Sequence, residues 1–166
     1  MTDSGMTTIH LGLGTNIGNR NENLTRAIEA LSLALGHYTA LSPFIETAPW
    51  GFNSDNAFLN CVVAYETELE PERLLDTTES IERRLGRTAK STGDTYHDRI
   101  IDIDILLYGN VAVKSARLTI PHPLMHLREF VLEPLAVIAP SIVHPTIGKS
   151  IRQLAAELKE QEAQKG

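Results

Sequence analysis

Cysteine is nearly absent from this chain of 166 residues. Cys61 stands alone, so no disulfide can form within the chain. A single cysteine fits a reducing compartment. Apolar runs long enough to span a bilayer are also missing, and the first ten residues lack the basic segment and apolar core of a secretory signal. We therefore expect a cytoplasmic protein with no membrane partner.

Positive charge and aromatic side chains are scarce as well. The formal net charge is −6, and only 5% of the residues are aromatic. A general nucleic-acid binder needs a basic surface, and an RNA-binding ferredoxin-like domain needs aromatic residues on two central strands. Both classes are disfavoured, so we expect no nucleic-acid partner.

One stretch departs from this acidic balance. Between residues 87 and 128 there are six Lys and Arg residues and four Asp residues, a net charge of +2. A locally basic stretch suits a compact anionic ligand such as a polyphosphate. Chance clustering on a solvated surface is the alternative, and charge alone does not decide between them.

The apolar periodicity that is present predicts a single α+β domain over residues 1–166. Alternation predicts strands at 7–14, 38–46, 58–69 and 98–109, and helical spacing predicts helices at 21–35 and 71–85. The order β-α-β-β-α-β is the ferredoxin-like pattern, with an antiparallel sheet. Two extra C-terminal helices are expected, at 128–138 and from about residue 150 to a fraying tail. The first two helices should cover one face of the sheet and leave the other free for ligand.

The fourth predicted strand, "DRIIDIDILLYG", carries two aspartates inside an apolar run. Asp102 and Asp104 project from the same face, roughly 6–7 Å apart at the backbone. The apolar residues that should point to the helices are Ile101, Ile103, Ile105 and Leu107. Two carboxylates at this spacing suit magnesium, which completes its shell with water and phosphate oxygens. A pair of partly exposed aspartates held by arginines is an equally weighted alternative.

The third predicted strand places Phe58 and Asn60 on one face. An aromatic ring beside an amide suits a flat heterocycle, although this strand alone favours Phe58 as an ordinary core residue. Gly12 and Gly14 in "GLGTNIGN" should make room on the open face, because this segment lacks a Walker Lys-Ser/Thr. His122 and His126 have zinc-like spacing, but the prolines that flank His122 and the absence of a cysteine nearby in the sequence disfavour a zinc site.

Several segments together resemble the 6-hydroxymethyl-7,8-dihydropterin pyrophosphokinase family. They cover nearly the whole chain, in the family's order: "LGTNIGNR", "TAPWG", "FLN", "IERRLGR", "DRIIDIDILLYG" and "RLTIPHPLMHLREFVLEPL". The R-x-x-D-x-D signature at residues 99–104 is the most specific of them. The resemblance implies a ferredoxin-like fold and transfer of pyrophosphate from ATP to the pterin, with AMP released, in folate biosynthesis.

The resemblance also implies roles on the ATP side. Asp102 and Asp104 would hold two magnesium ions and, with Arg87 and Arg99, form the catalytic set. Lys90 and Tyr96 would lie on a lid over the phosphates. The remaining nucleotide-site residues would be Glu79, Glu82, Arg117, Thr119, His122 and Arg128. The lid segment "TYHDR" departs from the family, with Tyr96 in place of a tryptophan, which affects lid details and not the reaction class.

On the pterin side, the resemblance implies that Phe58 and Phe130 sandwich the ring and that Asn60 bonds its edge. Backbone groups near Thr47, Ala48 and Trp50 would assist. We therefore expect a monomeric ATP-dependent pyrophosphokinase. The alternative is a catalytically silent ferredoxin-like module that only binds nucleotide or pterin, which would not need both metal ligands.

Overall fold

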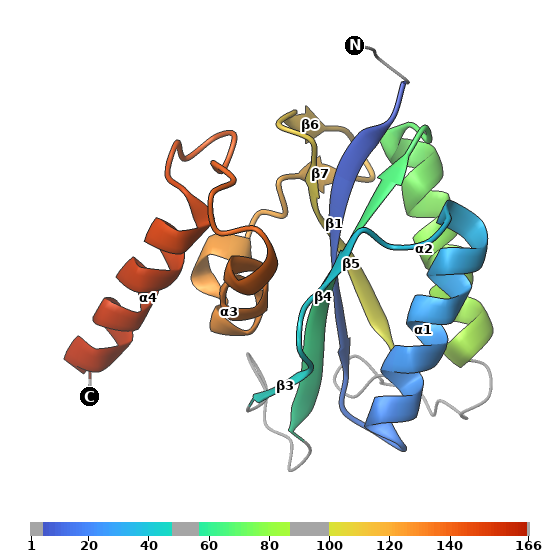
Figure 1. Cartoon of the computed structure of the whole chain (residues 1–166), viewed down its shortest axis with the longest axis horizontal. Coiled ribbons are helices and arrows are strands. Elements are labelled where there is room, and N and C mark those ends of the chain that lie inside the picture. The colour runs from blue at the N-terminus through green and yellow to red at the C-terminus, as the bar shows by residue number, and fades with distance from the viewer. Residues whose placement is uncertain (1–4, 48–56, 87–99, 166) are drawn as a thin grey trace.

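A five-stranded antiparallel sheet runs through the computed structural model, which describes residues 5–47, 57–86 and 100–165 (Figure 1). Its main strands lie in the order β2 (Ala40–Leu41), β4 (Phe58–Thr67), β1 (Thr7–Thr15) and β5 (Asp102–Tyr108). A further strand, β3 (Ile45–Thr47), also pairs with β4. With its two crossover helices, this is the ferredoxin-like arrangement, and the predicted fold class is confirmed.

The single strand expected at residues 38–46 is two short strands, β2 and β3. Pro43 lies between them and cannot donate to a sheet ladder, because it has no backbone N–H. Ser42 compensates for the break. Its N–H donates to the Val62 carbonyl, and its Oγ accepts from the Val62 N–H, each at 2.9 Å. The expected continuous strand was wrong, but the segment stays attached to β4.

Two helices, α1 (Arg20–Leu35) and α2 (Pro71–Gly86), cover one face of the sheet. Asn19 caps α1 by accepting from the Glu22 N–H at 3.1 Å, and Gly36 follows the helix with a φ of 96°. The predicted apolar stripes are buried against β1, β4 and β5, for example Leu31 and Ile81. Both helix predictions are confirmed.

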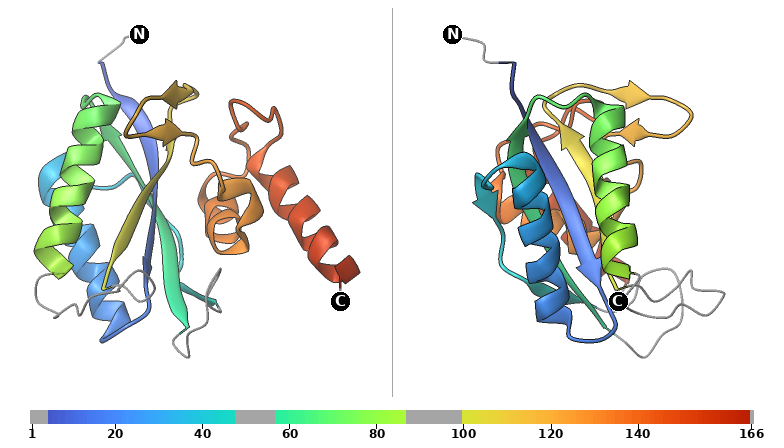
Figure 2. Two further views of the ribbon diagram at one scale, coloured as in Figure 1. Left: turned by 180° about the vertical axis from the view of Figure 1, so that it is seen from behind. Right: turned by 90° about the vertical axis from the view of Figure 1, so that its right-hand side faces the viewer.

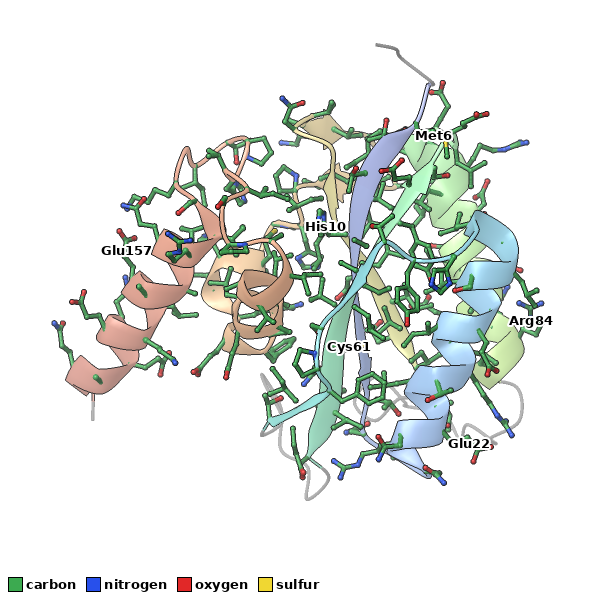
Figure 3. The ribbon with its side chains drawn as sticks, viewed as in Figure 1. Met6, His10, Glu22, Cys61, Arg84 and Glu157 are labelled. Atoms are coloured by element: carbon green, nitrogen blue, oxygen red, sulfur yellow. The ribbon has the colours of Figure 1, made fainter. Side chains whose placement is uncertain are left out.

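The opposite face of the sheet is partly covered, contrary to our expectation. Helix α3 (Glu129–Ile138) packs against β4, and α4 (Ile151–Lys165) packs outside α3 (Figure 2). These layers share a second core, which includes Val62, Leu106, Val131, Leu135 and Leu154. Figure 3 shows side chains between the layers, with Arg84 on α2 and Glu157 on α4 at opposite outer sides. The last helix also continues to Lys165, where we had expected fraying.

Strand β5 contains a β-bulge that the sequence pattern did not reveal. The pairing with β1 shifts by one residue, since His10 lies opposite Leu107 but Leu11 lies opposite Ile105. Leu106 is therefore the extra residue. Because of this shift, Leu107 belongs to the second core rather than facing α1 and α2 as expected. Ile101, Ile103 and Ile105 do face those helices.

The region after Gly109, expected to be irregular, contains a short hairpin. Strand β6 (Val113–Lys114) pairs with β7 (Thr119–Ile120), and a single 3-10 turn, η1 (Met125–Leu127), precedes α3. The chain then lies along the outer edge of β5, where the His122 N–H donates to the Leu106 carbonyl at 3.1 Å. Across the residues that the structure describes, no helix is long and apolar enough to cross a membrane.

Candidate active site

A row of residues crosses the sheet at the end that α3 leaves uncovered. Asp102 on β5 lies opposite Gly14 on β1, and Gly14 lies opposite Asn60 on β4. Neighbouring strands are about 4.8 Å apart, so Asp102 and Asn60 are about 10 Å apart at the backbone. In Figure 1 this is the lower end of the sheet, where β1 ends and β4 and β5 begin. The row places a carboxylate and an amide on either side of a residue with no side chain.

Gly14 is required by the close approach of its neighbours. A Cβ atom there would lie 2.9 Å from Asn60 Oδ1 and 3.6 Å from Phe58 Cδ1. The amide of Asn60 is held from its other end, because its Nδ2 donates to Thr47 Oγ1 at 2.8 Å. Asn60 is only 4% exposed, so this orientation is fixed by packing. The structure therefore brings together three of the predicted pterin residues: Thr47, Phe58 and Asn60.

Phe130 reaches the same region from the first turn of α3, which contacts both β3 and β4. The guanidinium carbon of Arg128 lies 5.5 Å from the centroid of the Phe130 ring. This distance is typical of a cation–π contact. Phe58 is half-buried and Phe130 packs at the margin of the second core, so each ring retains exposed surface.

Asp104 lies beside two groups that the resemblance assigns to the nucleotide site. Its Oδ2 is 3.9 Å from Arg128 Nη1 and 4.0 Å from His122 Nε2. The Asp104 side chain is 29% exposed, and the side chains of Arg128 and His122 are 17% and 20% exposed. Partial burial strengthens electrostatic interactions while leaving the cluster open to a ligand.

His122 is neutral at pH 7. Its pKa is lowered to about 4, first by burial and then by the charge of Arg128, against an opposing effect of Asp102. Its Nδ1 accepts from the Leu124 N–H at 3.1 Å, so in the neutral ring the proton is on Nε2, the atom turned toward Asp104. Because the ring is uncharged, the contact with Asp104 is not an ion pair. His122 can donate a hydrogen bond from Nε2 to an anionic ligand.

Other predicted nucleotide residues lie along the outer edge of β5. Glu82 Oε2 accepts from the Ile103 N–H at 2.6 Å. Arg117, at the β6–β7 hairpin, contacts carboxylates of α2 instead of the aspartate pair: Glu72 at 3.1 Å, Asp76 at 2.8 Å and Glu79 at 3.3 Å. The hydrogen bond with Asp76 is the largest of the effects that raise the pKa of Arg117. Thr119 is exposed on β7.

Sequence reasoning missed the contact of Arg117 with helix α2: Glu79 was a predicted nucleotide-site residue, but Glu72 and Asp76 were not among the predicted site residues. Glu72, Asp76 and Glu79 recur at intervals of four and three residues, which places them on one face of α2. This acidic stripe was the available signal, and a cation facing it could have been expected. Six predicted site residues lie outside the described ranges: Ala48, Trp50, Arg87, Lys90, Tyr96 and Arg99.

The aspartate pair fits magnesium held jointly with phosphate better than a cage made of protein alone. Within residues 5–47, 57–86 and 100–165, no group of three or more His, Cys, Asp or Glu side chains could hold a metal ion. Magnesium commonly takes one or two carboxylates and completes its shell with water and substrate phosphates. Asp102 and Asp104 are both half-buried, which leaves them accessible. The contact of Asp104 with Arg128 is expected whether the aspartate pair binds magnesium or is simply held by arginines, so it does not decide between these alternatives.

Comparison with known proteins identifies the family. The family model for 7,8-dihydro-6-hydroxymethylpterin-pyrophosphokinase (HPPK) matches residues 10–140 of this chain. The chain belongs to this family. The predicted resemblance and the enzyme class, an ATP-dependent pyrophosphokinase, are confirmed.

Relatives of similar length support the assignment. The 2-amino-4-hydroxy-6-hydroxymethyldihydropteridine pyrophosphokinase of Porphyromonas gingivalis is 50% identical over 141 residues, which cover 84% of this chain and 95% of the relative. The enzyme of the same name from Methylorubrum extorquens is 42% identical over 154 residues, covering 92% of this chain and 94% of the relative.

Solved structures of HPPK-DHPS proteins share the HPPK fold. One, in complex with substrates, has a TM-score of 0.73 at 16% identity, over 96% of this chain and 44% of that one. The wild-type Plasmodium falciparum protein with pteroate has a TM-score of 0.74 at 17% identity, over 98% of this chain and 45% of that one. This chain thus spans less than half of those proteins, and the likeness concerns the fold.

Proposed function

We propose that this chain transfers pyrophosphate from ATP to 6-hydroxymethyl-7,8-dihydropterin at the uncovered end of the sheet, releasing AMP. Membership of the pyrophosphokinase family supports the reaction. The observation that supports the location is the row from Asp102 through Gly14 to Asn60. A site for two substrates needs a charged part and a ring-binding part within reach of each other, and this row supplies both.

The phosphate half of the proposed site contains Asp102, Asp104, His122 and Arg128. The two aspartates would hold two magnesium ions, which when bound neutralise charge on the phosphate oxygens. Arg128 lies 3.9 Å from Asp104, so it can add a cation on the same side. Neutral His122 can donate a hydrogen bond from Nε2. We assign Arg87, Arg99, Lys90 and Tyr96 to the triphosphate by the resemblance alone.

The pterin half contains Asn60 and Thr47, with Phe58 and Phe130 for the ring faces. Asn60 donates through Nδ2 to Thr47, so its Oδ1 is the atom that can accept from a ring N–H. The absent side chain at Gly14 keeps this oxygen from being covered. Backbone groups near Ala48 and Trp50 complete this half by the resemblance. Glu79, Arg117 and Thr119 are assigned to the nucleotide side on the same basis.

The reaction joins the two halves. The hydroxymethyl oxygen attacks the β-phosphorus of ATP, and the bond from that phosphorus to the oxygen bridging the α-phosphorus breaks. AMP leaves with the bridging oxygen, and an aspartate carboxylate accepts the hydroxyl proton. The chain contributes chiefly by holding the reacting atoms in line and by supplying opposite charge.

We also propose that the enzyme acts as a monomer in the cytoplasm, without nucleic acid. The negative net charge argues against a nucleic-acid partner. All residues of the row from Asp102 to Asn60 come from one chain, which supports a monomer. Light scattering of the purified protein tests the monomer: a mass near 18.3 kDa is expected, and a stable dimer contradicts it.

Product analysis tests the proposed reaction. Protein, MgATP and 6-hydroxymethyl-7,8-dihydropterin should yield AMP and a pterin diphosphate in equal amounts, separated by chromatography. Omitting the pterin should nearly stop AMP formation, since water is a poor substitute for a positioned hydroxyl. Asp102→Asn, which keeps the shape and removes the charge, serves as the matched control. ADP as the main product would overturn the mechanism, and no turnover would favour a silent binding module.

A further inference from the structure

Strand β5 carries the aspartates at the edge of the sheet. It pairs with β1 on one side and ends the strand order on the other. Alternate backbone groups of an edge strand point away from the sheet and need partners from elsewhere in the molecule. The partners on this outer edge therefore determine how firmly the aspartate segment is held.

The outward N–H at this segment belongs to Ile103, the residue between the two aspartates. It donates to Oε2 of Glu82, a residue of helix α2, at 2.6 Å. Consecutive N–H groups of a strand point in opposite directions, so those of Asp102 and Asp104 face β1. The side chain of Ile103 is 5% exposed and packs on the helix side, while the aspartates project from the opposite face. Holding the Ile103 backbone therefore holds the stretch of strand from which both aspartate side chains project.

This hydrogen bond is stronger than an ordinary ladder bond. Its acceptor is a carboxylate, and hydrogen bonds to charged groups are shorter and roughly twice as strong as neutral ones. Glu82 is itself well anchored, because its neighbour Ile81 is 2% exposed in the core beneath α2. Three residues earlier, Glu79 turns to Arg117 instead, so the two acids of α2 have different partners.

The outer edge is held again beyond Asp104. The Leu106 carbonyl accepts from the His122 N–H at 3.1 Å, at the site of the β-bulge. That contact joins two backbones and so depends little on side-chain identity. The contact at Ile103 depends on one side chain, which makes it the point where a single substitution can loosen the segment.

We propose that Glu82 is a positioning residue that holds the Asp102–Asp104 pair in its metal-binding geometry through the Ile103 N–H. The metal-binding role of the Asp102–Asp104 pair rests on the proposed function, whereas the hydrogen bond from Ile103 to Glu82 is observed in the structure. The resemblance places Glu82 in the nucleotide site. The structure gives it a role that exists before any nucleotide binds.

Hydrogen exchange in the protein without metal or nucleotide tests the contact. Glu82→Ala should speed exchange of the Ile103 amide about tenfold, the loss expected for one hydrogen bond to a charged acceptor. Glu82→Gln keeps an acceptor oxygen and should retain most of the protection. Glu66→Ala is the matched control, because it removes an exposed carboxylate from the far end of β4 and should leave Ile103 unchanged.

Manganese binding tests the consequence. Titration of Mn²⁺ by electron paramagnetic resonance, with a non-hydrolysable ATP analogue present, should show affinity falling roughly tenfold in Glu82→Ala, as for other groups that orient metal ligands. Glu82→Gln should fall less, and Glu66→Ala should match the wild type. Denaturant unfolding of each variant shows whether a loss reflects global instability.

The outcomes separate the two proposals. If Glu82→Ala leaves the exchange rate of the Ile103 amide unchanged, the positioning role is wrong. It is also wrong if the exchange rate rises while the affinity for Mn²⁺ stays the same. Both conclusions hold even if the enzyme is active. If the wild type makes no AMP, the proposed function fails, while the exchange and Mn²⁺ measurements still support or overturn the positioning role of Glu82. Faster exchange together with weaker Mn²⁺ binding, both restored in part by glutamine, supports the proposal.

Discussion

One face of the sheet is built in two different ways along its length. Toward the end where β1 begins, Leu107 is buried in the second core and lies opposite the buried side chain of His10, which Figure 3 labels. Val62, also in the second core, lies at the boundary, in register with Gly12 and Asp104. Toward the other end, the same strands carry Gly14, Asn60 and the aspartates. The change occurs within a few residues of each strand, without any break in the ladder between β1 and β4.

The comparison shows how a small domain divides stability from chemistry. The covered half buries apolar side chains, and this burial supplies a share of the folding free energy. In the uncovered half, the corresponding positions hold carboxylates, an amide and a glycine instead of apolar side chains. Its polar groups are held by hydrogen bonds, such as that from Asn60 to Thr47 and that from Ile103 to Glu82. Substitutions in the two halves should therefore fail in different ways.

The largest effect is expected at the aspartates. Asp102→Ala or Asp104→Ala should lower turnover at least 10²–10³-fold, the loss typical of one transition-state contact, while the protein stays folded. Steady-state AMP formation and thermal unfolding measure the two quantities. Near-normal rates with magnesium would show that the pair is held by arginines for structural reasons only.

A truncation in the covered half should do the reverse. Leu135 is fully buried in the second core, so Leu135→Ala should cost about 2–5 kcal/mol of unfolding free energy. Turnover per folded molecule should hardly change. Denaturant unfolding and active-site titration check this, and a loss of turnover in fully folded protein would contradict the division between the halves.

Two glycines on one strand sharpen the comparison further. Gly14→Ala places a methyl 2.9 Å from Asn60 Oδ1 and should weaken pterin binding about tenfold or more, comparable to a 1–3 kcal/mol packing conflict. Gly12→Ala meets the side-chain end of Leu106 at 3.3 Å and should lower stability by about 1 kcal/mol instead. Calorimetric titration with a pterin ligand distinguishes them. Equal affinities in both variants would show that Gly14 does not serve the ring site.

The smallest effect concerns the pH dependence of stability. Burial lowers the pKa of His10, in the covered half, and of His122, at the border, to about 4 in each case. Between pH 6.5 and 4 the unfolded chain binds more protons at these sites, so stability present above pH 6.5 should fall as the pH drops. Each group contributes a slope of up to about 1.4 kcal/mol per pH unit.

Unfolding of His122→Asn across this pH range isolates one of the two contributions. The curve of the variant should be shallower than that of the wild type between pH 6.5 and 4. Parallel curves would mean that His122 is protonated in the folded state at these pH values, and the neutral donor assigned to it would then be wrong.

The order of helices and strands was predictable because each depends on local periodicity. The shared face of Asp102, Asp104, Phe58 and Asn60 was predictable because side chains alternate along a strand. Pro43 carried a visible signal for the break between β2 and β3. Whether α3 would cover the face was not predictable, because it depends on packing between distant segments.

Other features had no local signal at all. The bulge at Leu106 leaves the apolar pattern of β5 intact, so Leu107 was placed on the wrong face. The contact from Ile103 to Glu82 joins a strand to a helix 21 residues earlier, and Glu82 alone could have faced water. Such contacts follow from tertiary structure, and they are the ones that orient the proposed site.

The most direct test of the account is a crystal structure with Mn²⁺, a non-hydrolysable ATP analogue and a pterin ligand. Anomalous scattering at the manganese edge should give peaks at the carboxylates of Asp102 and Asp104, with the pterin ring beside Asn60 and over Gly14. The covered half, including His10 and Leu107, should be unchanged. Manganese peaks away from the aspartates, or a pterin bound elsewhere on the sheet, would contradict the central claim that the uncovered end of this face is the active site.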